Sequence, residues 1–169
     1  ANASLLFHRQ VTPLYIITGR VILEVMGTLM AGLIVATGAF LLGYMTPPQD
    51  YGLLYLGILF HISFSFATAL LVAALSERSE MIEKTITIFS YLSLPFSGAF
   101  AMVSWVSPHF QKILLWSPSV QSIEMIRGGQ FGETAHAKFS IIYAISINFI
   151  LILLGLSLTL RVRKFIKVQ

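Results

Sequence analysis

Four long apolar segments alternate with short polar ones along this chain. They cover about residues 14–45, 53–75, 84–103 and 138–160. Each exceeds the roughly 17 residues that a helix needs to cross the hydrocarbon core of a bilayer. The prolines of TPPQDYG and the charges of SERSEMIEK interrupt the pattern, because neither segment continues an apolar helix. The pattern therefore predicts an all-α integral membrane fold with four transmembrane helices, and it disfavours the alternative of buried helices in a soluble domain.

Residues 108–127 follow a different pattern, with two short amphipathic stretches at about 108–116 and 119–127. Ser-Pro dipeptides introduce the two stretches, and proline is well tolerated in a first helical turn. Both stretches are too short to cross a bilayer. Trp105 and Trp116 are typical of a membrane–water interface. We therefore expect two external half-helices that dip into the outer leaflet or lie at its surface, with a plain external loop as the alternative.

The basic residues orient the predicted spans. Of the eleven Lys and Arg residues, eight lie near the two ends of the chain or near the loop between the second and third spans. The other three, Lys112, Arg127 and Lys138, lie between the third and fourth spans, on the opposite side of the membrane. Cytoplasmic loops of membrane proteins carry an excess of Lys and Arg. We therefore expect both ends to be cytoplasmic, and residues 46–52 and 104–137 to face outward.

The composition supports a membrane protein and offers little catalytic chemistry. Of the 169 residues, 56% are hydrophobic and 11% charged, whereas soluble domains carry about 25% charged residues. The net charge of +4 forms no patch for nucleic acid, and there is no Cys for a disulfide or thiolate site. The histidines lack metal-ligand spacing. GGQFGET lacks the Gly-Lys pair of a phosphate loop. We therefore predict no catalytic residue, no metal site and no cofactor bound by this chain.

Few ionisable residues fall within the predicted spans. Glu24 stands four residues after Arg20, so an ion pair at the membrane edge is favoured over a proton relay. His61 is favoured to hydrogen-bond a neighbouring helix, and a substrate contact stays open as the alternative.

Two blocks of sequence carry a family resemblance. NASLLFHRQVTPLYIITGRVILE (2–24) and LPFSGAFAMVSWVSPHFQKILLWSPSVQSIEMIRGGQFGE (94–133) resemble the permease subunit of capsular polysaccharide ABC exporters, of the type-2 ABC exporter class. The resemblance covers nearly the whole chain. Members of this family have six transmembrane helices. Residues 1–169 would then be an N-terminally truncated transmembrane domain that resembles the C-terminal portion of such a permease, with its last four transmembrane helices. The two short stretches would then be a re-entrant pair on the periplasmic side.

The resemblance also implies partners. Permease subunits of this kind pair with a second copy, and each docks a separate ABC ATPase that binds ATP and magnesium. Residues 5–11 match the coupling helix that enters the ATPase. The ATPase-docking residues would be Leu6, Phe7, His8, Arg9 and Gln10. An ordinary interfacial helix on anionic lipid is the alternative for this segment.

The implied substrate is a lipid-linked, acidic capsular polysaccharide at the bacterial inner membrane, handed on to periplasmic and outer-membrane export components. Aromatic rings suit a sugar path, because sugars stack on aromatic faces. The predicted path residues are Phe60, Phe64, Tyr91, Phe96, Phe100 and Trp116. Packing between helices or against lipid is the alternative for each ring. Lys112 and Arg127 are candidates to attract an acidic chain.

Glu124 and Arg127 lie three residues apart on the second short stretch, so a pair between them is expected. Other functions stay open at this stage. A permease for O-antigen or teichoic acid would share these features, whereas an ion-driven transporter or a membrane-embedded glycan or lipid enzyme would need ionisable clusters that the sequence does not display.

Overall fold

A computed structural model describes residues 13–76 and 80–166 of the chain. Every regular element in this part is helical. The α-helices are α1 (Pro13–Leu41), α2 (Tyr51–Ser76), α3 (Glu80–Ser93), α4 (Pro108–Leu114), α5 (Pro118–Phe131) and α6 (Ile141–Ile166). Short 3-10 turns occupy η2 (Leu94–Ser97), η3 (Val103–Trp105) and η4 (Gly132–Ala135).

Three of the described helices are long and apolar enough to cross a membrane. They are the parts of α1, α2 and α6 that cover Leu14–Leu41, Tyr51–Ser76 and Ile141–Leu160. These spans confirm three of the four predicted apolar helices in type and approximate position.

Residues 84–103 do not form the single spanning helix that the apolar pattern predicted. Helix α3 ends at Ser93 after 14 residues, which at about 1.5 Å per residue is shorter than a hydrocarbon core of about 30 Å. Pro95 follows within η2, where its missing N–H cannot continue an α-helix. Gly98 then adopts a left-handed conformation with φ of 83° and turns the chain.

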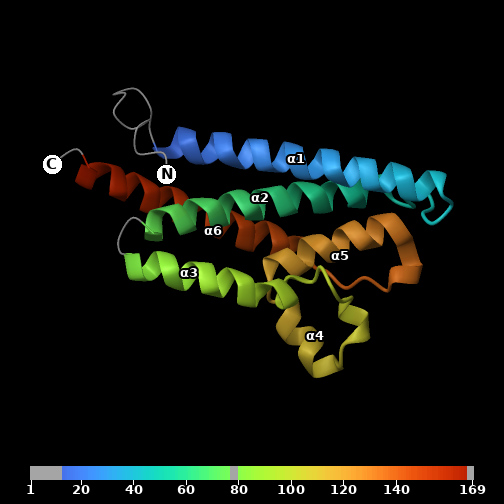
Figure 1. Cartoon of the computed structure of the whole chain (residues 1–169). Helices are drawn as coiled ribbons and strands as arrows, with labels where there is room; N and C mark the ends of the chain where they lie inside the picture. The colour runs from blue at the N-terminus through green and yellow to red at the C-terminus, as the bar shows by residue number, and fades with distance from the viewer. Residues whose placement is uncertain (1–12, 77–79, 167–169) are drawn as a thin grey trace.

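The helices run mostly along one direction (Figure 1). Helix α1 begins, α2 ends, α3 begins and α6 ends at one end of the molecule, which we call the terminal end. Residues 42–50, between α1 and α2, form the opposite end, which we call the turn end. Helices α4 and α5 lie toward the turn end, and α4 projects from the body.

Helix α2 is the centre of the packing. Its first half contacts α5 and its second half contacts α6. Glycines allow both contacts: a Cβ at Gly57 would lie 2.8 Å from the backbone nitrogen of Ile126, and one at Gly155 would lie 2.8 Å from Cβ of Leu70. Close approach at glycine is typical of helices that pack inside a membrane.

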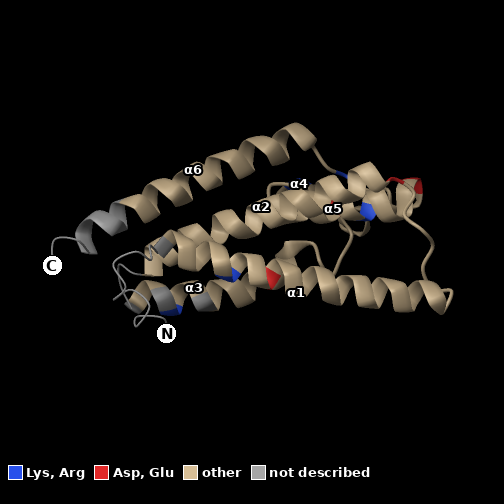
Figure 2. Cartoon of the chain, turned by 90° about the horizontal axis from the view of Figure 1, so that it is seen from above, with Lys and Arg blue, Asp and Glu red and all other residues tan. Residues whose placement is uncertain are grey.

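The small apolar core lies where α2, α5 and α6 meet. Phe60, Met125 and Ala144 are buried there, with partly buried Leu53 and Leu56 beside them. Charged residues are sparse along the described helices (Figure 2). Most large apolar side chains of α1 are exposed, which suits a helix whose surroundings include lipid.

Candidate functional site

Helix α5 is the most enclosed helix of the described chain. Nine of its 14 residues are buried, and five of these nine are Ser, Gln or Glu. It begins at Pro118 after the extended Ser117, and α4 begins at Pro108 after the extended Ser107. Both starts lie within or beside the two short stretches of the sequence pattern. Neighbouring segments surround α5, so we take it as the centre of the candidate site.

Glycine lets α5 lie directly on the start of α2. A Cβ at Gly129 would lie 2.7 Å from Cα of Leu54 and 2.8 Å from the carbonyl oxygen of Asp50. The N–H of Asp50 donates to the carbonyl oxygen of Gly129 at 2.9 Å, and its side-chain Oδ1 accepts from the N–H of Leu53 at 3.0 Å. The turn end is therefore fixed to α5 through backbone contacts.

Glu124 is a buried carboxylate that joins three segments. Glu124 is 1% exposed. Oε1 accepts from Nη1 of Arg127 at 3.0 Å and from the N–H of Val103 at 3.3 Å, and Oε2 accepts from the N–H of Lys138 at 3.1 Å. The predicted pair of Glu124 and Arg127 is confirmed. A buried carboxylate is stable only with such partners.

Arg127 uses its guanidinium on the backbone as well as on Glu124. Nη1 donates to the carbonyl oxygen of Ala101 and Nη2 to that of Ala99, each at 3.0 Å. The side chain is 15% exposed. The planar fork of an arginine suits this double contact, which a lysine ammonium cannot reproduce.

Two buried glutamines of α5 make further contacts outside this helix, which sequence reasoning missed. Nε2 of Gln130 donates to the carbonyl oxygen of Thr46 at 2.7 Å. Gln121 donates from Nε2 to the carbonyl oxygen of Leu115 at 2.7 Å, and its Oε1 accepts from the N–H of Ser140 at 2.7 Å. The available signal was the presence of amides on a short helix in a very apolar chain, because such groups require partners away from water.

His61 and Ser122 join α2 to α5. Nδ1 of His61 lies 3.0 Å from Oγ of Ser122, and that Oγ lies 2.9 Å from the carbonyl oxygen of Ser119. The hydroxyl hydrogen can go to that carbonyl, which leaves Oγ to accept from the imidazole. The predicted hydrogen bond to a neighbouring helix is confirmed.

The predicted ion pair on α1 is not formed. In residues 14–76 and 81–160, whose side chains are described except at 83 and 87, the one ion pair is that of Glu124 with Arg127. Arg20 and Glu24 are both exposed on α1. Exposed long side chains lose conformational entropy on pairing and gain little in return.

The six predicted path residues differ in how far the structure exposes them. Phe60 is buried in the core and Phe64 is half-buried on α2, whereas the other four rings are exposed. Tyr91, Phe96 and Phe100 follow one another along α3, η2 and the next segment, with exposed fractions of 72%, 64% and 74%. Trp116 is 80% exposed between α4 and α5, where its carbonyl oxygen accepts from the hydroxyl of Tyr143. A role of any of these rings in transport stays a prediction.

The predicted docking residues, Leu6, Phe7, His8, Arg9 and Gln10, lie outside the described residues. Their role also stays a prediction.

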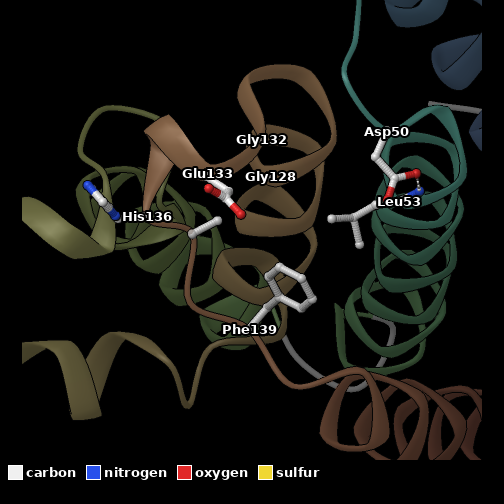
Figure 3. A pocket seen from close by; sticks show the side chains of 8 residues that line it. Asp50, Leu53, Gly128, Gly132, Glu133, His136 and Phe139 are labelled. Carbon is white, nitrogen blue, oxygen red and sulfur yellow. Dashed lines mark hydrogen bonds between the residues drawn. The ribbon is translucent and has the colours of Figure 1, made fainter.

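An open cavity of about 530 Å³ lies at the turn end, between the start of α2 and the end of α5. Figure 3 shows Leu53 and Phe139 on the apolar side of this cavity, and the ring of His136 pointing away from it. Asp50 and Glu133 add carboxylates to the lining. Among the described residues, no group of three or more His, Asp or Glu side chains could hold a metal ion.

Comparison with known proteins places this architecture in context. The ABC-2 type transporter family matches residues 3–131. The capsule polysaccharide export inner-membrane protein BexB of Haemophilus influenzae is 33% identical over all 169 residues. The capsule polysaccharide export inner-membrane protein CtrC of Neisseria meningitidis serogroup A is 30% identical over the same length. The chain spans 64% of the length of each of these relatives. No solved structure gives a significant match.

Proposed function

We propose that this chain, which belongs to the ABC-2 type transporter family, is the transmembrane subunit of an ATP-driven exporter. The exporter moves lipid-linked capsular polysaccharide across the bacterial inner membrane. One observation carries the proposal: the chain aligns over its whole length with relatives named as capsule polysaccharide export inner-membrane proteins. Its three long apolar helices supply the membrane-crossing elements that such a subunit requires.

The experiment that tests this function is complementation. The full-length protein is expressed together with its partner ABC ATPase in two bacterial strains, one that lacks its capsule permease and one that lacks its O-antigen permease. Surface polysaccharide is then measured with antibodies against capsule and against O-antigen. Restored capsule supports the proposal. Restored O-antigen without capsule, at normal protein abundance, would assign the chain to the related export of O-antigen instead.

The energy for export comes from a separate ABC ATPase that binds ATP and magnesium. GGQFGET lacks the Gly-Lys pair with which a phosphate loop holds nucleotide phosphates. Residues 5–11 are the proposed docking segment, with Leu6 and Phe7 in an apolar socket and Arg9 at its polar rim. A second copy of the permease completes the path, and periplasmic and outer-membrane components carry the polymer onward.

Docking is tested by Phe7→Ala and Arg9→Glu in the full-length protein. An apolar anchor at an interface contributes about 2 kcal/mol or more, and a reversed charge adds repulsion. Each variant should therefore recover less ATPase in detergent co-purification and should lower stimulated ATP hydrolysis. Phe40→Ala and Arg20→Glu are matched controls, because both residues are exposed on α1. Unchanged recovery and hydrolysis in the docking variants would remove residues 5–11 from the interface.

The proposed topology has four spans, both ends cytoplasmic and a re-entrant pair formed by α4 and α5 on the outer side. In this proposal the third span, residues 84–103, crosses as α3, η2 and the segment after them, and not as one continuous helix. Single cysteines introduced into a cysteine-free protein report it through labelling from outside. Gln49 and Glu133 are both exposed, so they serve as the outer labelling sites. Labelling of Glu133→Cys and Gln49→Cys, but not of Ser79→Cys, is expected. Labelling of Ser79→Cys alone would reverse the orientation.

A further inference from the structure

The segment from Ser97 to Val103 is attached to α5 at every second residue. Oγ of Ser119 donates to the carbonyl oxygen of Ser97 at 3.2 Å. Arg127 donates to the carbonyl oxygens of residues 99 and 101, each at 3.0 Å, and Glu124 accepts from the N–H of Val103 at 3.3 Å. We call residues 97–103 the clamped segment, since α5 side chains hold it along its length.

Phe100 stands in the middle of the clamped segment. The carbonyls on either side of it, those of Ala99 and Ala101, are the two that Arg127 holds. Its own side chain is 74% exposed. Gly98 lies against α5, where a Cβ would come within 3.2 Å of Cγ2 of Val120. The backbone of this segment is therefore held by α5 while the ring of Phe100 is exposed.

Arg127 and Glu124 are poorly placed to touch a polymer themselves. Both hydrogens of Nη1 are engaged, one by Glu124 and one by Ala101, and Nη2 is engaged by Ala99. Glu124 is 1% exposed. These contacts argue against the expectation that Arg127 attracts an acidic chain, and they favour a role that acts through the clamped segment.

We propose that Glu124 and Arg127 are positioning residues that hold Phe100 as a fixed aromatic contact for the exported glycan. This inference rests on the proposed export function. An aromatic face offers a sugar ring apolar contact without a directional hydrogen bond, so a polymer can advance past it. A ring on a fixed backbone makes this contact without the entropy cost of ordering a loop.

Arg127→Lys is the variant that separates positioning from charge. It keeps a cation beside Glu124 but cannot bridge two carbonyls in the geometry of a guanidinium. The first measurement places a nitroxide label at Phe100→Cys in the full-length complex with its ATPase and records its mobility. A label at Phe40→Cys, also an exposed phenylalanine, is the control site, and Arg20→Lys on exposed α1 is the matched control substitution.

The second measurement is a cycle of Arg127→Lys, Phe100→Leu and the double variant, read as surface capsule per permease molecule. Each single variant is expected to lower export about twofold or more, in the range of couplings that such cycles resolve. The double variant should export as much capsule as the single variant that exports less, because both changes remove the same contact.

The label at position 100 should become more mobile in Arg127→Lys and should keep its mobility in Arg20→Lys. The mobility of the label at position 40 should not change in either variant. Unchanged mobility at position 100, normal export in Phe100→Leu, or multiplied losses in the double variant would each overturn the inference. Where Arg127→Lys does not accumulate, Glu124→Gln is measured in the same way and decides the result. A failure of the wild-type protein to restore capsule contradicts the proposed function instead, and the mobility measurement still decides the positioning role.

Discussion

Helices α1 and α5 place their polar and apolar residues in opposite ways. Helix α1 has 29 residues, and only 6% of its most apolar window is buried within the chain. Helix α5 has 14 residues and buries nine of them, including Glu124, Gln121 and Gln130. The more apolar helix is the exposed one, and the more polar helix is the enclosed one.

The contrast follows from the solvent. Lipid accepts apolar side chains but offers no hydrogen bonds, so α1 loses nothing by facing outward. The polar groups of α5 need partners that lipid cannot supply, and backbone and side chains of the surrounding segments provide them. In this protein, buried polar groups therefore identify the tertiary contacts better than apolar ones do.

The largest effect that would test this contrast is expected from Glu124→Ala. The change leaves the guanidinium of Arg127 and the N–H groups of Val103 and Lys138 without their acceptor. Breaking one side of a buried pair costs about 3–5 kcal/mol. The free energy of unfolding, measured by SDS titration in mixed micelles, should fall by this amount. A loss below about 0.5 kcal/mol, the size of ordinary surface changes, would show that α5 is not held by its polar groups.

A smaller loss is expected from Phe60→Ala, which opens a space beside Met125 and Ala144. Soluble cores lose about 3–5 kcal/mol on this change, and we expect about 2–3 because lipid is as apolar as the core. The same SDS titration measures it. Phe40→Ala on α1 is the matched control and should change stability by less than about 0.5 kcal/mol. Equal losses in the two variants would show that α1 is packed as closely as α2.

The smallest expected loss comes from Gly129→Ala. The added Cβ would approach the backbone of Leu54 and Asp50, which cannot move aside as a side chain end can. Overpacking of this kind costs about 1–3 kcal/mol. Gly32→Ala on α1 is the matched control, because nothing lies within 4 Å of its Cβ position; its helix propensity should make it neutral or slightly stabilising. A stable Gly129→Ala protein with unchanged thermal unfolding would contradict the close α2–α5 contact.

The sequence by itself determined the features that depend on local patterns. Apolar runs of sufficient length predicted α1, α2 and α6, because the thickness of a bilayer fixes the length of a spanning helix. The spacing of Glu124 and Arg127 predicted their pair, since residues three apart lie on one helix face. The amphipathic stretches also placed α4 and α5 to within a few residues.

Only the tertiary structure decided which of these residues meet across the chain. Arg127 holds carbonyls 26 and 28 residues away, and Gln130 reaches Thr46 across 84 residues. Six aromatic residues that look alike in sequence divide into the buried Phe60, the half-buried Phe64 and four exposed rings. Periodicity reports the face of a helix but not its neighbour, because the neighbour depends on how distant segments pack. The closeness of that packing is set by glycines such as Gly57 and Gly129, whose missing Cβ atoms let α5 lie on α2.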